Sequence, residues 1–160
     1  MVGLLCYKQR AVTDGRLNIR RGKRVDFAAV LDLARRAGTF ESVPESETGL
    51  ARLFRRLVRD LGCDLYVAER GGEVQGVVMV SYRRLFVRGG LCALVDALLA
   101  GGQDGEIRER LFAFAKERAR KKGCRVLQVQ VGEPPAGEWK RLLADAGLTA
   151  TGTWFSCSLA

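Results

Sequence analysis

One carboxylic acid stands in a stretch of sequence where it could do chemistry. Asp96 interrupts the apolar strand predicted over residues 91–99. Burial disfavours the charged form of a carboxylate and makes it a better proton acceptor near neutral pH, so we expect Asp96 to be a partly buried general base. Strict alternation places Val95 and Ala97 together on the other side of the strand. The alternative is an acid on the solvent side of a strand end, or one paired with an arginine. Glu133, just past the next predicted strand, is the second candidate base.

Other common catalytic groups are missing from the sequence. The chain has no histidine, which excludes Ser-His-Asp and Cys-His catalysis and any zinc site that needs histidine. It has no Cys-x-x-Cys pair either, so we expect no metal, and we expect most cysteines to be small buried residues. The five cysteines are Cys6, Cys63, Cys92, Cys124 and Cys157.

Apolar periodicity predicts the elements that would position these residues. A strand near residues 17–20 precedes a helix capped by Asp26, and a second helix follows near residues 50–61. Residues 64–99 are typical of a three-strand antiparallel meander. The later elements are a helix over residues 107–122, a strand over 125–131, a short helix over 139–146 and closing strands over 149–159.

The predicted order is therefore β-α-α-β-β-β-α-β-α-β. Because a helix joins the strands at 91–99 and 125–131, we expect these two strands to be parallel neighbours. The fold class is α/β (α+β), with a central mixed, mostly antiparallel sheet and helices on both faces. We expect residues 17–160 to form a single domain and residues 1–16 to be an arm or an extra strand.

Charge and hydropathy restrict the partners. No apolar run approaches the ~18 residues that span a membrane, and the N-terminus lacks the features of a signal peptide, so we expect a cytoplasmic protein that binds no membrane. The net charge is +9, and a basic surface attracts polyanions such as nucleic acid or a phosphate-bearing cofactor. No zinc-finger or helix-turn-helix pattern is present, and aromatic residues do not alternate with basic ones, so we expect no specific nucleic acid.

Four segments, taken in order and spacing, resemble the GNAT superfamily of N-acetyltransferases over about residues 17–160. Asn-Ile-Arg-Arg at 18–21, followed by Asp26, resembles the first strand and helix start of the family. Residues 67–78 resemble its second and third strands around a tight turn. Residues 119–129 resemble its long helix and fifth strand, and residues 144–148 resemble the end of its fourth helix.

The resemblance implies an acetyl-CoA site beside the fourth strand. In the family, the backbone of this strand holds the pantetheine arm and the thioester oxygen, which implies that role for Leu98, Leu99 and Ala100. The family also holds the CoA pyrophosphate in a loop written R/Q-x-x-G-x-G/A. The corresponding residues here are Gln103, Asp104, Gly105, Glu106, Ile107 and Arg108.

Two positions depart from the family pattern. Glu106 and Arg108 replace the small residues of the loop, and a glutamate there adds bulk and a repelling charge. Neighbouring glycines could rebuild the cradle, and Arg108 or Arg110 could offset the charge. The alternative is an ordinary strand-to-helix turn. The tyrosine that protonates the leaving thiolate in many family members is replaced by Leu143, and Tyr82 could substitute for it or simply pack on the sheet.

The function implied is that of an acyl-CoA-dependent N-acyltransferase. The donor is acetyl-CoA or another acyl-CoA, no metal is needed, and the acceptor is a primary amine that the sequence does not name. Two other functions remain open: a GNAT-fold sensing or interaction module that has lost catalysis, and a basic nucleic-acid-binding domain. A homodimer is compatible with the sequence.

Overall fold

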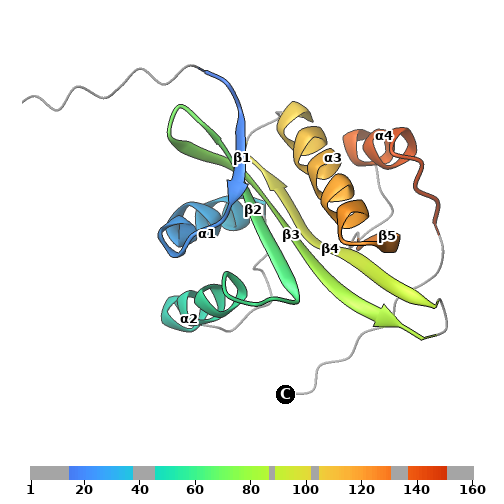
Figure 1. The fold of residues 1–160 in the computed structure, drawn as a ribbon. Coiled ribbons are helices and arrows are strands. Elements are labelled where there is room, and N and C mark those ends of the chain that lie inside the picture. Colours follow the sequence, from blue (N-terminus) through green and yellow to red (C-terminus); the bar gives the residue numbers. More distant parts are fainter. Residues whose placement is uncertain (1–14, 38–45, 87–88, 102–104, 131–136, 151–160) are drawn as a thin grey trace, which may run out of the picture. The chain divides into compact units, whose positions relative to one another are not determined.

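Five strands form one sheet whose spatial order follows the sequence order, as Figure 1 shows. The computed structural model describes residues 15–37, 46–86, 89–101, 105–130 and 137–150. Contacts divide the chain into two units, residues 1–130 and 131–160, and the sheet belongs to the first. The strands are β1 (Asn18–Arg21), β2 (Cys63–Arg70), β3 (Glu73–Leu85), β4 (Gly90–Ala100) and β5 (Cys124–Val129).

The pairing of the strands confirms the predicted mixed sheet. β1, β2, β3 and β4 pair antiparallel in turn, and β4 pairs parallel with β5. The helix α3 (Gly105–Lys121) makes the crossover between the two parallel strands, as a parallel connection requires. The first hairpin turns at Gly71 and Gly72, whose φ angles are 60° and 84°, which explains why glycine occupies both positions.

The helices also lie close to their predicted places. α1 (Phe27–Arg36) follows a short 3-10 turn, η1 (Arg24–Asp26), and α2 (Glu47–Leu57) begins after Ser46, whose side chain accepts a hydrogen bond from Gly49 N. In the second unit, α4 (Gly137–Asp145) is the predicted short helix. The predicted closing strands lie mostly in residues 151–160, and the N-terminal arm lies mostly in residues 1–14; both stretches are outside the described residues.

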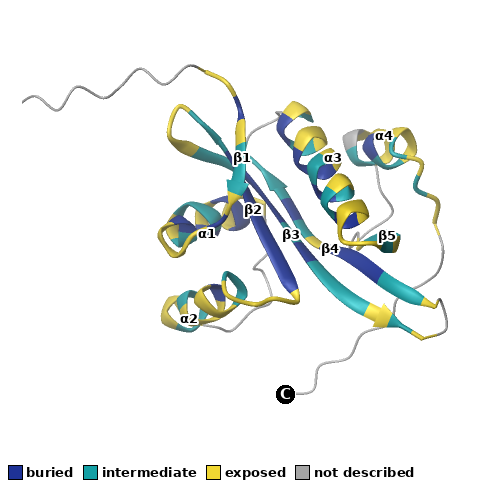
Figure 2. Ribbon diagram, viewed as in Figure 1, coloured by how far each residue is buried: buried dark blue, intermediate teal, exposed yellow. Residues whose placement is uncertain are grey.

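Helices cover both faces of the sheet, and the core lies against each face (Figure 2). On one face, α1 and α2 pack Leu33 and Phe54 against β2 and β3, together with Leu65, Val67 and Val77. On the other face, α3 buries a stripe that includes Ile107, Leu111, Phe112 and Ala115. Successive residues of a strand point to opposite faces, so β3 serves both layers.

At Gly76 of β3, side chains of α3 lie directly over the strand backbone. A Cβ atom at this position would lie 2.8 Å from side-chain carbons of both Ile107 and Leu111, and 3.0 Å from the carbonyl oxygen of Leu99. Any side chain here would push the helix away from the strand. The absence of a side chain therefore fixes the height of α3 above β3.

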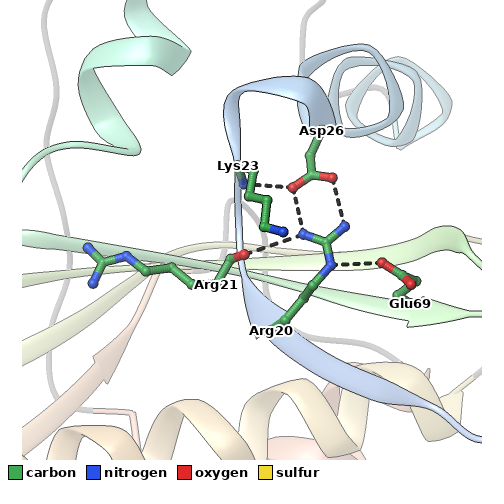
Figure 3. A network of polar contacts seen from close by, with 5 residues as sticks. All are labelled: Arg20, Arg21, Lys23, Asp26 and Glu69. Carbon is green, nitrogen blue, oxygen red and sulfur yellow. Dashed lines mark hydrogen bonds and ion pairs between the residues drawn. The ribbon is translucent and has the colours of Figure 1, made fainter.

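A polar network ties β1 to β2 and to the start of α1 (Figure 3). The guanidinium of Arg20 donates to both carboxylate oxygens of Asp26 at 2.8 and 2.9 Å, and its Nε donates to Glu69 at 2.7 Å. The backbone N–H of Lys23 also donates to Asp26. The prediction that Asp26 caps α1 is correct for its position but wrong for its contact, because its side chain makes no cap hydrogen bond to that helix. The hydrogen bonds from Arg20 hold the pKa of Asp26 below its usual range.

Replacing Asp26 by asparagine should lower the stability of the protein. At pH 7 we expect Asp26→Asn to lower the free energy of unfolding by about 2 kcal/mol, because the charge of Arg20 loses a nearly buried partner. Because the pKa of Asp26 is lower in the folded state, this stabilisation is complete above the unfolded pKa of about 4 and disappears as the pH falls through the folded pKa. Urea unfolding of both proteins between pH 7 and pH 3 measures the difference.

The matched control for Asp26 is Asp32→Asn, which removes an exposed carboxylate of α1 that pairs with Arg36. We expect a change within about 0.5 kcal/mol for this surface pair. A wild-type advantage over Asp26→Asn that stayed constant down to pH 3 would show that the ion pair is not its source.

Adding a side chain at Gly76 should destabilise the packing of α3. Valine suits a strand backbone, so Gly76→Val tests the close contact alone, and we expect a loss of about 2–3 kcal/mol from overpacking. Gly15→Val is the control, because a Cβ there meets nothing within 4 Å, and it should change stability by less than about 0.5 kcal/mol. Equal unfolding midpoints in urea for the two variants would contradict the proposed role of Gly76.

Candidate functional site

Strand β4 contains one residue more than β3 at its centre. Met79 of β3 pairs with Ala97, whereas the next residue, Val80, pairs with Val95, so Asp96 has no partner in β3. An extra residue of this kind is a β-bulge, which bends the strand and re-aims a side chain. The prediction that Val95 and Ala97 share a face is wrong, because their partners are adjacent residues of β3 and therefore point to opposite faces.

The pairing of β4 with β5 ends beside this bulge. The last pair of the parallel ladder is Val95 with Val129, whereas pairing with β3 continues to Ala100 opposite Gly76. On their outer side, residues 96–100 face no strand of the described part of the chain. Alternate backbone groups of a strand point to each side, so this segment presents N–H and C=O groups at an open edge. An extended molecule that carries amide groups can pair with such an edge.

The residues predicted to hold the pantetheine arm form this open edge. Leu98 is buried, and Leu99 packs against the core cluster under α1 and α2. Ala100 ends the strand. Because the two leucine side chains point into the protein, the edge offers its backbone, which is the part that the prediction requires.

The first turn of α3 lies next to the end of the open edge. Ile107 is buried, and its side chain lies over the backbone of Gly76. Gly76 in turn pairs with Ala100, the last residue of the edge. The first N–H groups of a helix have no acceptor within the helix and attract anions. Gly105 begins α3, so the predicted residues Gly105 to Arg108 form its first turn. The side chain of Ile107 is committed to the core, and only its backbone is available to a ligand.

Asp96 is exposed, so the expectation of a partly buried carboxylate is wrong. The physical reason is the bulge, which takes Asp96 out of the alternating pattern that would have buried it among its apolar neighbours. Its role as a general base stays a prediction, now for an acid in contact with solvent. Glu133, Gln103 and Asp104 lie outside the described residues, and their predicted roles remain untested.

Glu106 does not stand alone at the start of α3. One oxygen of its carboxylate lies 3.4 Å from a guanidinium nitrogen of Arg70, and the other lies 3.3 Å from one of Arg110. Arg110 was among the residues expected to offset this charge. Arg70, at the end of β2, was not, because it is 36 residues away along the chain and nothing in the local sequence connects the two.

A second polar cluster, which the sequence did not indicate, surrounds Asp64 at the start of β2. This buried carboxylate accepts hydrogen bonds from the hydroxyls of Tyr82 at 3.0 Å and Tyr66 at 3.3 Å, and it pairs with Lys122 at 3.2 Å. Burial opposes its charge, but the hydrogen bonds from Lys122 and Tyr82 outweigh burial and lower the pKa of Asp64. Tyr82 lies opposite Ala93, well before the bulge, and its hydroxyl is already engaged. These contacts favour the structural alternative for Tyr82.

The described cysteines behave as small core residues. Cys63 and Cys92 are buried and Cys124 is partly buried, all as free thiols. Burial raises the pKa of Cys63 to about 11, which keeps it protonated and unreactive. Within the described ranges, no three cysteine, aspartate or glutamate side chains converge as metal ligands would. None of the helices described is both long enough and apolar enough to cross a membrane.

Comparison of the sequence with known families gave no match to a family model, and none to a curated protein. Comparison of the structure did. A transcriptional regulator from Bacillus halodurans C-125 is similar with a TM-score of 0.76 and 19% identity, over 90% of this chain and 100% of that one. A GNAT family acetyltransferase from Staphylococcus aureus is similar with a TM-score of 0.72 and 14% identity, over 89% and 98% of the two chains.

A third similar structure, from Clostridium acetobutylicum, is described as a predicted acetyltransferase with acetyl-CoA. Its TM-score is 0.69 at 11% identity, over 90% of this chain and 97% of that one. Several more are described as acetyltransferases. Identities this low show a shared fold and leave activity open. The mixed sheet, the parallel pair of β4 and β5 and the α3 crossover agree with the sequence prediction, and the chain has the fold of the GNAT acetyltransferases.

Proposed function

We propose that this protein is a cytoplasmic, acyl-CoA-dependent N-acyltransferase that moves an acetyl group from acetyl-CoA to a primary amine. The observation that carries this proposal is the open backbone edge of residues 96–100 beside the N-terminus of α3. An acyl-CoA carries an extended arm with two amides and, at its other end, phosphates. The edge suits the amides, and the helix N-terminus suits the phosphates.

The reaction needs few groups from the protein. The protonated amine first loses a proton to a base. The neutral amine then attacks the thioester carbonyl, a C–N bond forms, and the C–S bond breaks to release the CoA thiolate. A backbone N–H at Leu98 or Leu99 stabilises the negative charge on the carbonyl oxygen in the transition state. After the attack the nitrogen loses its second proton to solvent, the thiolate gains one from solvent, and the charges balance without a metal.

Asp96 is the base that we assign to this reaction. It is the extra residue of the bulge, and bulges beside active sites re-aim side chains. It directly precedes the backbone segment assigned to the thioester, so its carboxylate is close in sequence and in strand position to the reacting carbon. An exposed carboxylate can take the proton directly or through one water molecule.

The test of the proposed function is binding followed by turnover. We expect calorimetry to detect acetyl-CoA binding to the purified protein, and a panel of primary amines to include at least one that releases the CoA thiol. Binding without turnover on any amine would favour the sensing or interaction module. No binding of acetyl-CoA would refute the proposal.

The nucleic-acid alternative is tested in parallel. The exposed face of α2 presents Arg52, Arg55 and Arg56 with Arg59 just beyond the helix, opposite the face that buries Phe54. Contacts to phosphates release counterions and weaken steeply with salt. For a solvated arginine face we expect only weak, sequence-independent DNA binding that vanishes by physiological salt. Tight binding of a defined duplex at that salt would favour a nucleic-acid-binding domain.

Replacing Asp96 by asparagine should slow turnover and spare binding. Asp96→Asn keeps the size of the side chain and removes the base, so we expect kcat to fall on the order of 10²–10⁴-fold with CoA affinity and unfolding midpoint unchanged. The loss should shrink at high pH, where more of the amine is already neutral. Asp32→Asn, an exposed acid of α1, is the control and should keep the wild-type rate. Wild-type kcat in Asp96→Asn would refute the assignment and transfer it to Glu133.

A further inference from the structure

Two arginines from different elements converge on one exposed carboxylate at the start of α3. Arg70 comes from the end of β2, Arg110 comes from the second turn of α3, and each contacts a different oxygen of Glu106. The side chain of Glu106 is 58% exposed. Its carboxylate therefore occupies an anion position made by two guanidinium groups beside a helix N-terminus.

The same helix contains a local cluster for comparison. Glu117 contacts Arg120 and Lys121 at 3.8 and 3.7 Å, and all three residues lie within one turn of α3. Such pairs follow from helical spacing alone. Helical spacing accounts for Arg110 but not for Arg70, which the β2–β3 hairpin brings to Glu106 from outside the helix. The positive site at Glu106 is thus built by the tertiary structure.

The contacts that hold Glu106 are weak ones. Exposed ion pairs contribute little to stability, because solvent screens them and both side chains lose freedom. A guanidinium makes stronger, charge-assisted hydrogen bonds to phosphate, whose oxygens match its planar fork. A phosphate that binds at this turn can therefore replace the Glu106 carboxylate as the partner of Arg70 and Arg110. The side chain of Glu106 then rotates into solvent.

We propose that Arg70 and Arg110 bind the phosphates of CoA and that Glu106 is the internal counter-ion that the phosphates displace. This inference rests on the proposed acyl-CoA function and adds to it. Guanidinium side chains take over part of the task that glycine and close backbone approach would perform in the loop. The carboxylate keeps the arginines in position when CoA is absent, and it competes with phosphate for them.

The experiment compares variants in which one charged side chain is replaced by glutamine. Calorimetry measures their affinity for CoA, and a chemical-shift titration measures their affinity for pantetheine, which has the same arm without phosphates. We expect Arg70→Gln and Arg110→Gln each to weaken CoA binding about tenfold, the effect of one lost charge-assisted hydrogen bond. We expect Glu106→Gln to strengthen CoA binding about threefold, because the competing charge is gone. Pantetheine binding should be the same in all of them.

Two variants of the local cluster are the controls. Glu117→Gln and Arg120→Gln make the same changes of net charge on the same helix, and they should leave CoA affinity at the wild-type value. Thermal unfolding verifies that each variant is folded.

The outcomes separate this inference from the proposed function. CoA binding by the wild type that Arg70→Gln and Arg110→Gln do not weaken would overturn the inference and leave the function standing. The inference is also overturned if Glu106→Gln and Glu117→Gln have the same CoA affinity, because Glu106 then does not compete with the phosphates. Failure of the wild type and of Glu106→Gln to bind CoA would overturn the proposed function itself.

Discussion

The pairing of β4 is the constraint on which the candidate site depends. β4 must follow β3 as far as Ala100 and β5 only as far as Val95, and the extra residue Asp96 stands where the two requirements part. A bulge bends and twists its strand, and within the described residues the ladder with β5 ends at this point while the ladder with β3 continues. Without the extra residue, alternation would run unbroken through Asp96. The end of the described β4–β5 ladder and the exposed acid thus meet at one inserted residue.

The packing of α3 fixes the start of the helix beside this edge, so the two features that the proposed function assigns to one ligand are neighbours. Ile107 and Leu111 rest above Gly76, and Gly76 pairs with Ala100 at the end of the edge. The helix start is therefore fixed relative to the backbone that ends β4. On the opposite face, the cluster around Leu33 and Phe54 holds β2 and β3. The packed core of the first unit lies under the edge, which is where a positioned backbone needs its support.

Most of the fold could be predicted from the sequence because its causes are local. Apolar periodicity placed the helices and strands, and the crossover rule made β4 and β5 parallel. The bulge could not be predicted, since it depends on the register of β4 with two neighbours, and Asp96 fits plain alternation equally well. Two polar contacts failed for a similar reason. Asp26 has the sequence of a cap but pairs with Arg20, and the partner of Glu106 on the hairpin is far away in the chain.

The acid and the base of the proposed reaction are not equally important. Leu143 stands where many family members have the tyrosine acid, and Tyr66 and Tyr82, the tyrosines in the described residues, both donate to Asp64. A thiol has a pKa near ~8.5, so a thiolate can leave unprotonated and collect its proton from water. An amine with a pKa near ~10.4 is neutral in only about one molecule in 2,500 at pH 7. Proton removal from the amine is therefore the harder step, so the proposed reaction depends more on the base than on the acid.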